Sequence, residues 1–327
     1  NFRPIKLEHF EEQLANLQKD SNLLFSEEFE GIAELSPKHD SIAAQKEENK
    51  PKNRYVNILA FDHSRVKLLP IDDDETTDYI NANYIPGYKS QREYIATQGP
   101  LVTNVGGVDI STIPDFWRMI WEQRVAIIVM LSDLTEKGKP KVDKYWKDQG
   151  ESEQYGDIIV EVTSVSVLNK YTIKIFEMKL GEEVRKVRHF FLPGWEDYRA
   201  NLQPEDVLEF LSVVRQEVKP IDKGPMVVHC SAGVGRTGTF IALDIFQQYI
   251  NERDMSSDID IYDLVLRMRK FRQHMVQSEK QYIFIHETIK EIINRRKKRL
   301  QDNDTAIYEN TGFSNEAFGK STNHSQY

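Results

Sequence analysis

The segment from Val227 to Gly238 constrains the fold and chemistry of this chain more than any other part of its sequence. It contains Cys230, the only cysteine among 327 residues, and Arg236 follows six positions later. A short apolar run from Met226 to Val228 precedes the cysteine and is typical of a buried strand. After the segment, apolar residues recur at helical spacing, at Ala242, Leu243, Phe246, Tyr249 and Ile250. The sequence therefore predicts a tight loop over residues 231–235, between a strand and a helix.

The composition of this loop suits the binding of an anion. Gly233 and Gly235 allow backbone angles that are closed to other residues, so successive N–H groups can converge on a phosphate at a helix N-terminus. The same field favours the thiolate form of Cys230. The planar guanidinium of Arg236 matches two phosphate oxygens. Thiolate, amide groups and guanidinium together indicate phosphoryl transfer to the cysteine.

Two plainer interpretations of the segment are weaker. The first is that Cys230 is a small buried residue beside an ordinary glycine turn. This interpretation does not explain why the other residues of the segment, such as Arg236, occur together with the cysteine. A nucleotide-binding loop requires Gly-Lys followed by Ser or Thr, and no such triplet follows the glycines here.

Composition excludes several other classes. The chain is 39% hydrophobic and 29% charged, which is typical of a globular protein. Its net charge of −9 argues against a general nucleic-acid binder, and a single cysteine rules out an internal disulfide. No apolar run reaches membrane-spanning length, and no signal peptide is visible. Because the chain begins with Asn1, we expect it to be a fragment of a longer protein.

Periodicity along the chain predicts an α/β or α+β domain with mixed strands flanked by helices. Residues 1–36 have helical spacing, and residues 37–52 are polar and predicted as a loop. Val125 to Leu131 is a continuous apolar run, expected as a central buried strand. Residues 102–114 are predicted as an extended surface loop. After Pro204 the pattern is largely helical, and residues 300–327 lack periodicity and are predicted to be disordered.

Several separated blocks make the chain similar to the classical protein tyrosine phosphatases. His229–Gly238 resembles their signature, and four further blocks agree: Asn53–Tyr55, Asp78–Ile85, Ala96–Pro100 and Gln277–Tyr282. Residues 54–59 and 62–68 resemble receptor types with one catalytic domain, the vascular endothelial and density-enhanced group. The resemblance implies a juxtamembrane helical segment over residues 1–24, a catalytic domain with a twisted mixed sheet over residues 25–299, and a tail over residues 300–327. It also implies the cytoplasmic portion of a single-pass membrane receptor.

The resemblance also implies roles for individual residues. Asp197 falls at the position of the acid that protonates the leaving tyrosyl oxygen and later activates water. Tyr55 matches an aromatic wall that favours phosphotyrosine over shorter phosphoserine, and Gln277 and Gln281 match glutamines that position the water. The remaining implied roles are support of the thiolate and of sulfur departure (His229, Thr237), orientation of the arginine and lining of the cleft (Glu136, Lys141), and phosphate binding (Ser231, Ala232, Gly233, Val234, Gly235).

The segment around Asp197 departs from the usual Trp-Pro-Asp pattern. Glu196 replaces the usual proline, Arg199 a usual glycine and Asn201 a second usual proline. Loss of prolines enlarges the open ensemble, so closure over the substrate should cost more. We expect a working but slower phosphatase, and Glu196→Pro combined with Arg199→Gly should raise its rate.

Alternative functions remain open on the sequence alone. The altered acid segment is consistent with a phosphotyrosine-binding pseudophosphatase, and the cysteine loop is consistent with a phosphoinositide phosphatase. No metal-ligand cluster is visible, and no cofactor is implied. Tyr308 with Asn310 resembles an adaptor SH2 docking motif. The basic run at residues 295–299 is explained either by solvation at a helix end or by contact with an acidic membrane face.

Overall fold

A nine-stranded twisted sheet forms the centre of the structure, a computed structural model that describes residues 4–318 and, of these, the side chains up to residue 307. Its strands lie in the order β10-β11-β12-β13-β7-β14-β4-β3-β2. The four central strands, β13, β7, β14 and β4, are parallel, and the outer pairs are antiparallel. In sheet order the bounds are Ser152–Tyr155, Ile158–Val167, Thr172–Leu180, Glu183–Phe191, Ile127–Met130, Met226–His229, Tyr94–Thr97, Tyr79–Ile85 and Arg65–Lys67.

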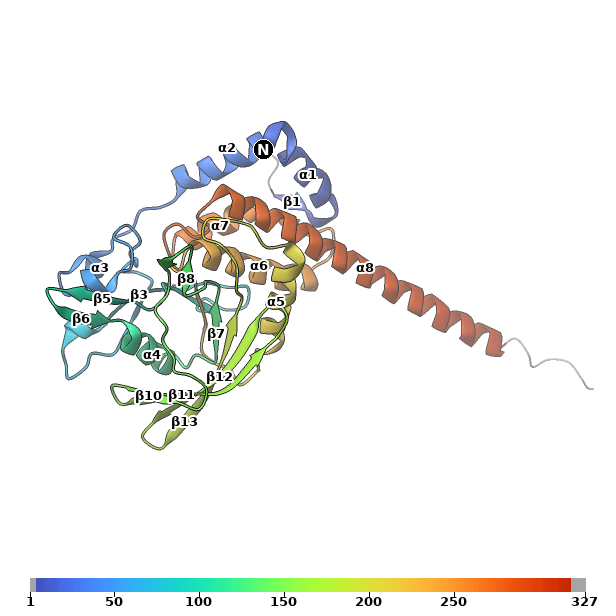
Figure 1. The fold of residues 1–327 in the computed structure, drawn as a ribbon. Helices are drawn as coiled ribbons and strands as arrows, with labels where there is room; N and C mark the ends of the chain where they lie inside the picture. The colour runs from blue at the N-terminus through green and yellow to red at the C-terminus, as the bar shows by residue number, and fades with distance from the viewer. Residues whose placement is uncertain (1–3, 319–327) are drawn as a thin grey trace, which may run out of the picture.

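Helices cover both faces of this sheet (Figure 1). They are α1 Phe10–Leu17, α2 Lys19–Leu35, α3 Ile42–Gln45, α4 Ile113–Glu122, α5 Pro204–Gln216, α6 Gly235–Glu252, α7 Ile261–Arg269 and α8 Glu279–Phe318. Short 3-10 turns occur at Leu7–His9, Lys50–Lys52 and Glu75–Thr77. Three small strand pairs complete the described fold: β1 Ile5–Lys6 with β15 Asp258–Ile259, β5 Val102–Val105 with β6 Val108–Ser111, and β8 Thr135–Glu136 with β9 Lys139–Pro140.

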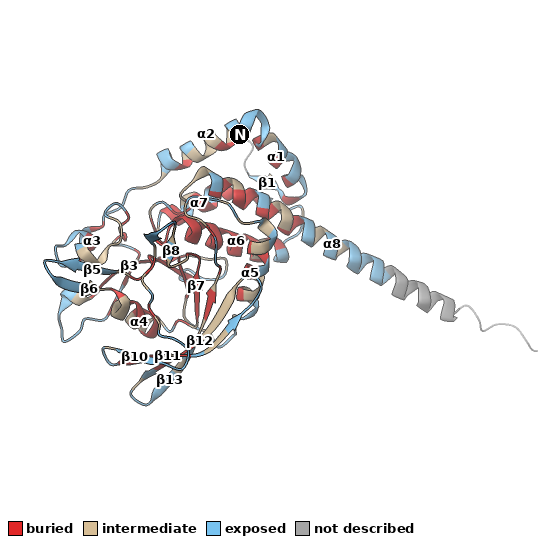
Figure 2. Ribbon diagram, viewed as in Figure 1, coloured by how far each residue is buried: buried red, intermediate tan, exposed pale blue. Residues whose placement is uncertain are grey.

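The central strands are buried on both faces, as the continuous apolar run at Val125–Leu131 predicts. In β7, Ile127 and Val129 pack with α5, α6 and α8, whereas Ile128 and Met130 pack with α4 on the other face. Figure 2 shows the resulting layer of buried residues at α6, α7 and β7. The predicted fold class, a twisted mixed sheet flanked by helices, is confirmed.

The segment 102–114 lies at the surface as predicted, but its residues 102–111 form a hairpin of β5 and β6 rather than an extended loop. The turn is Gly106-Gly107, with φ of 60° and 87°, the left-handed conformation that two-residue hairpin turns require. Val102, Val105 and Val108 are exposed, so the strands carry no alternation of buried and exposed residues to reveal them.

The prediction of disorder from residue 300 also differs from the structure, in which α8 continues to Phe318. The first part of α8 is anchored by buried isoleucines such as Ile289 and Ile293, and Arg299 still contacts Asn251 of α6. The outer part of the helix projects away from the domain (Figure 1). The sequence from residue 295 to residue 307 is mostly charged or polar, so it shows no apolar periodicity that would predict a helix. Residues 319–327 lie outside the described residues.

The N-terminal residues form the predicted helices, with two additions. Asp20, Ser21 and Asn22 have positive φ values, so the backbone breaks within the first turn of α2. Ile5 pairs with Ile259, which attaches the start of the chain to the segment before α7. No helix among residues 4–318 is both long and apolar enough to span a bilayer.

Candidate active site

Cys230 lies where the central strand β14 ends and α6 begins, as predicted. The loop of residues 230–236, here called the phosphate loop, connects the two elements. Cys230 is 2% exposed, and its Sγ accepts hydrogen bonds from the Gly233 N–H at 3.3 Å and from the Thr237 hydroxyl at 3.2 Å. The sulfur is therefore held at the floor of the loop with two donors directed at it. The structure thus brings Thr237 to the position that its implied role requires.

The carbonyl groups of the phosphate loop are bound by the surrounding protein. Arg272 donates to the carbonyls of Gly233 and Ala232, both at 2.9 Å, and the carbonyl of Val234 accepts from the Val276 N–H at 3.0 Å. These carbonyl oxygens are occupied by groups outside the loop, and the Gly233 N–H points inward to Cys230 Sγ. This geometry forms an amide cradle for an anion.

Gly233 is the position where this loop requires glycine. Its φ is +74°, and a Cβ atom would lie 2.2 Å from the carbonyl oxygen of Thr97. Both the backbone angle and the close approach of β4 therefore exclude other residues. At Gly235 a Cβ atom would lie 3.0 Å from Gln281, a milder conflict.

Arg236 is fully buried beneath the acid segment. Its Nη1 donates to Glu136 at 2.5 Å and to the carbonyl of Trp195 at 2.6 Å. Burial lowers its pKa, but the charges of Cys230, Asp197 and Glu136 outweigh burial, so its pKa is raised. Nε and Nη2 are buried and have no hydrogen-bond partner among the described residues. Two unused donors on a buried guanidinium beside a sulfur fit two oxygens of a phosphoryl group.

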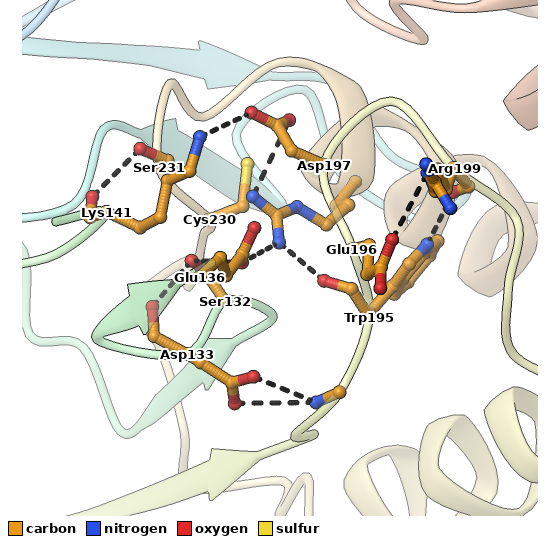
Figure 3. A network of polar contacts seen from close by, with 12 residues as sticks. Ser132, Asp133, Glu136, Lys141, Trp195, Glu196, Asp197, Arg199, Cys230 and Ser231 are labelled. Atoms are coloured by element: carbon orange, nitrogen blue, oxygen red, sulfur yellow. Dashed lines mark hydrogen bonds and ion pairs between the residues drawn. The ribbon is translucent and has the colours of Figure 1, made fainter. Parts of the chain in front are cut away.

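Asp197 faces the sulfur from a loop of residues 194–201, here called the acid loop (Figure 3). Its Oδ2 accepts from Lys141 Nζ at 3.1 Å, and its Oδ1 lies 3.6 Å from Arg236 Nη2. The bond to Asp197 outweighs partial burial and raises the pKa of Lys141. The structure therefore gathers Asp197, Lys141, Glu136, Arg236 and Cys230 into one site.

Within the acid loop φ is positive at Gly194 and at Tyr198, with values of 80° and 57°, and not at Arg199. Arg199, which stands where a glycine is usual, therefore needs no positive φ, and the strain of a non-glycine residue occurs one position earlier, at Tyr198. Tyr198 is held by two contacts with the segment before α8. Its hydroxyl accepts from Gln277 Nε2 at 3.2 Å, and its carbonyl accepts from the Ser278 hydroxyl at 3.0 Å.

The three residues that depart from the usual pattern, Glu196, Arg199 and Asn201, contact one another and the backbone of the loop. Glu196 pairs with Arg199 at 3.1 Å and with Lys137 at 3.4 Å, so its charge is balanced by two cations. Asn201 donates to the carbonyl of Gly194 and accepts from the N–H of Glu196. The acid loop therefore has side-chain contacts where prolines are usual.

Tyr55 contacts the phosphate loop, and the two glutamines contact each other at the start of α8. The Tyr55 hydroxyl lies 2.8 Å from Ser231 Oγ, and Ser231 in turn donates to the carbonyl of Lys141. Gln281 Oε1 accepts from the N–H groups of Gln277 and Ser278, at 3.0 Å and 3.2 Å. Its Nε2 is buried and has no hydrogen-bond partner among the described residues, so it is free to hold a water or phosphate oxygen.

His229 lies behind the sulfur in a buried polar chain. Its Nδ1 is 3.1 Å from the carbonyl of Cys230, and its Nε2 is 2.8 Å from the hydroxyl of Tyr145, which also contacts His189 at 2.7 Å. Burial lowers the pKa of His229 to about 4 and that of His189 well below its usual value. Both rings are neutral at pH 7. The described contact of His229 is with the backbone of Cys230, and support of the thiolate through it stays a prediction.

Sequence reasoning missed Arg272, Tyr145 and Tyr198. Arg272 is completely buried and binds Asn81 and Asn83, both at 2.9 Å, in addition to the loop carbonyls. Burial lowers its pKa to about 10. The available signal was the pair Asn81 and Asn83, because two amides on alternate positions of a buried strand need a polar partner.

The comparisons with known proteins agree with this geometry. The family model described as protein-tyrosine phosphatase matches residues 49–291. The chain is similar to rat receptor-type tyrosine-protein phosphatase F, with 44% identity over 88% of the chain and 14% of the relative. It is also similar to chicken receptor-type tyrosine-protein phosphatase eta, with 42% identity over 94% of the chain and 21% of the relative, and to the chicken type S protein, with 43% over 89% and 18%.

A buried cysteine in an amide cradle, with an arginine below it and an acid facing it, defines a cysteine-dependent phosphatase site. The chain belongs to the protein-tyrosine phosphatase family, because the family model covers well over half of it. The resemblance to the receptor-type members is confirmed. The chain spans between 14% and 21% of the length of the relatives named here. The predicted bounds of its domains stay predictions.

Proposed function

We propose that this chain hydrolyses phosphotyrosine in proteins through a cysteinyl-phosphate intermediate. The observation that carries the proposal is the pair of buried Arg236 donors, Nε and Nη2, that have no hydrogen-bond partner among the described residues and lie beside Cys230 and below Asp197. A dianionic phosphoryl group entering the cradle satisfies both donors. Tyr55 forms the wall against which the phenyl ring of the substrate lies.

The reaction proceeds in two steps. In the first, the Cys230 thiolate forms a bond to phosphorus while the bond from phosphorus to the tyrosyl oxygen breaks, and Asp197 gives its proton to that oxygen. In the second, water held by Gln277 and Gln281 attacks phosphorus, Asp197 takes up a proton, and the sulfur leaves as a thiolate with Thr237 donating to it. The products are tyrosine and inorganic phosphate.

The decisive test measures hydrolysis of a phosphotyrosine peptide, a phosphoserine peptide and a phosphoinositide by the wild type and Cys230→Ser. We expect turnover of the phosphotyrosine peptide alone and its loss in Cys230→Ser. Because Cys230 is the only cysteine, a phosphorylated intermediate must appear as a single mass increase that Cys230→Ser lacks. Phosphotyrosine binding without turnover would instead indicate a pseudophosphatase, and preference for the inositide a lipid phosphatase.

The setting of the domain is part of the proposal. Relatives carry the name receptor-type, which supports the cytoplasmic portion of a membrane receptor. The basic run at the exposed part of α8 supports contact with an acidic membrane face. Two of its members already have partners, Arg295 with Glu291 at 2.8 Å and Arg299 with Asn251 at 2.6 Å. Sedimentation with vesicles that contain phosphatidylserine, compared with neutral vesicles, tests this contact.

Docking of an SH2 adaptor at phosphorylated Tyr308 is also proposed. The structure places residues 307–310 within α8 rather than in a tail without regular structure, and the side chain of Tyr308 lies outside the described residues. Binding of a phosphorylated peptide of residues 303–315 to an isolated SH2 domain, with the unphosphorylated peptide as control, decides the matter.

A further inference from the structure

The side chain of Asn201, at the end of the acid loop, binds the backbone of Gly194 and Glu196 near the start of the same loop. Its Nδ2 donates to the carbonyl of Gly194 at 2.8 Å, and its Oδ1 accepts from the N–H of Glu196 at 3.0 Å. Both atoms of the carboxamide bind the same turn, one as donor and one as acceptor. The orientation of the amide is therefore fixed, because a flipped amide would place donor against donor and acceptor against acceptor.

The residue between these two anchors, Trp195, contacts the catalytic arginine, and the acid lies just beyond the second anchor. Trp195 lies between them, and its carbonyl accepts from Arg236 at 2.6 Å while its indole N–H donates to the carbonyl of Arg199 at 2.9 Å. Asp197 follows two residues later. Any loosening of the turn at Glu196 therefore moves both the carbonyl above Arg236 and the carboxylate that faces Cys230.

We propose that Asn201 is a positioning residue for the acid step, whose side chain holds the acid loop closed with Asp197 above Cys230. It replaces the fixed backbone of a proline with two hydrogen bonds across the loop. The inference rests on the proposed function, because Asp197 is the proton donor there. Two exposed hydrogen bonds are enough to shift a loop equilibrium by about tenfold.

The proposal makes Glu196 and Asn201 interdependent. The N–H of Glu196 is the donor to Asn201, and proline has no N–H. We call the two hydrogen bonds of Asn201, to Gly194 and to Glu196, the clamp. A proline introduced at position 196 alone would therefore break the clamp, although proline is the usual residue there. Glu196→Ala keeps the N–H and removes only the exposed ion pairs with Arg199 and Lys137, which contribute little.

The experiment compares kcat and KM for Asn201→Ala, Glu196→Pro and Glu196→Ala. Each is assayed with a phosphotyrosine peptide and with p-nitrophenyl phosphate, whose more acidic phenol needs less protonation on leaving. We expect kcat on the peptide to fall about tenfold in Asn201→Ala and Glu196→Pro, with a smaller loss on p-nitrophenyl phosphate and little change in KM. Glu196→Ala and the exposed control Asn169→Ala should stay within about twofold of the wild type.

Two results would overturn the proposal. One is an equal loss on both substrates, which indicates general damage rather than loss of the acid. The other is a Glu196→Pro variant that behaves like Glu196→Ala. In the Asp197→Ala background, Asn201→Ala should add less than about twofold, because a positioning residue has nothing left to position.

A measurement without turnover separates this inference from the proposed function. Asn201→Ala should speed amide hydrogen exchange over residues 194–201, the Glu196 N–H above all, and leave residues 226–240 unchanged. If the wild type shows no hydrolysis but exchange rises as expected, the proposed function fails and the clamp stands as a structural contact. If hydrolysis is normal and exchange is unchanged, the clamp alone fails.

Discussion

The phosphate loop and the acid loop face each other across one site but are held in different ways. Cys230 and Arg236 are 2% and 0% exposed, and the carbonyls of their loop are bound by the fully buried Arg272. Asp197 is partly exposed, and its loop is held by the exposed Asn201 and by the ion pairs of Glu196. The first loop shares the stability of the core, whereas the second can open without disturbing it. We therefore expect the nucleophile to stay fixed while the acid moves.

The largest expected effect comes from adding a Cβ to the phosphate loop. Gly233→Ala combines a φ of +74° with a contact of 2.2 Å to the Thr97 carbonyl, so it should destabilise the domain by about 4 kcal/mol or more. Gly181→Ala is the matched control, because its φ is +58° with no atom within 4 Å, and it should cost about 1 kcal/mol. Urea unfolding measures both. Equal costs would show that the backbone angle, and not the packing against β4, is what requires Gly233.

Removal of the acid should affect rate far more than stability. Asp197→Ala is expected to lower kcat for a phosphotyrosine peptide by about 10²–10⁴-fold, because the tyrosyl oxygen then leaves without a proton. Its free energy of unfolding should change by less than about 1 kcal/mol, since the acid loop lies outside the core. Steady-state kinetics and urea unfolding on the same preparation make the comparison, with Asp157→Ala as an exposed control. An unchanged kcat would remove Asp197 from the mechanism.

Acid should destabilise the region behind the phosphate loop. Burial lowers the pKa of His229 from 6.5 to about 4, so the unfolded chain binds more protons than the folded one between these values. Stability is therefore present above pH 6.5 and is lost as the pH falls towards 4, by on the order of 3 kcal/mol for this residue. Urea unfolding between pH 4 and pH 7 measures the slope, which should persist in Asp197→Ala and decrease in His229→Asn. A slope that His229→Asn leaves intact would assign it to His189 or His286, which are also buried and neutral.

The smallest expected effect is the change in kcat when prolines are restored in the acid loop. The sequence alone predicts that Glu196→Pro with Arg199→Gly raises turnover, but the structure changes the expected sign, because the proline removes the donor to Asn201. Glu196→Pro combined with Asn201→Pro exchanges the clamp for a rigid backbone, and its kcat should return to within about threefold of the wild type. A faster Glu196→Pro, Arg199→Gly variant in the same kinetic assay would restore the sequence-based view.

Consecutive residues allowed most of the phosphate loop to be predicted. The strand, the cysteine, the glycines and the arginine lie within one short segment, so their relative positions follow from local geometry. The helical and strand patterns likewise predicted β7, β14 and α6, because their burial leaves apolar periodicity. Where elements are exposed, as in the β5–β6 hairpin and the outer part of α8, no such pattern exists and the prediction was wrong.

Contacts between distant segments could not be predicted in the same way. Arg272 reaches the phosphate loop from about 40 positions further along the chain, and Gln277 meets Tyr198 from about 80 positions away. The contact of Asn201 with Glu196 is local, yet it depends on a turn in which Tyr198 has a positive φ. A tyrosine gives no sign of such an angle in the sequence. The replacement of two usual prolines in the acid loop therefore predicted that the loop closes less readily. The structure instead shows hydrogen bonds of Asn201 in their place.

The sequence by itself determined the nucleophile, the arginine and the class of chemistry, because those residues act through a short loop that any chain with this spacing must form. Tertiary structure alone decided how the acid is held over the sulfur. Lys141, Arg236 and Asp197 come from three separate segments, and their distances of 3.1 Å and 3.6 Å exist only when the sheet has brought those segments together.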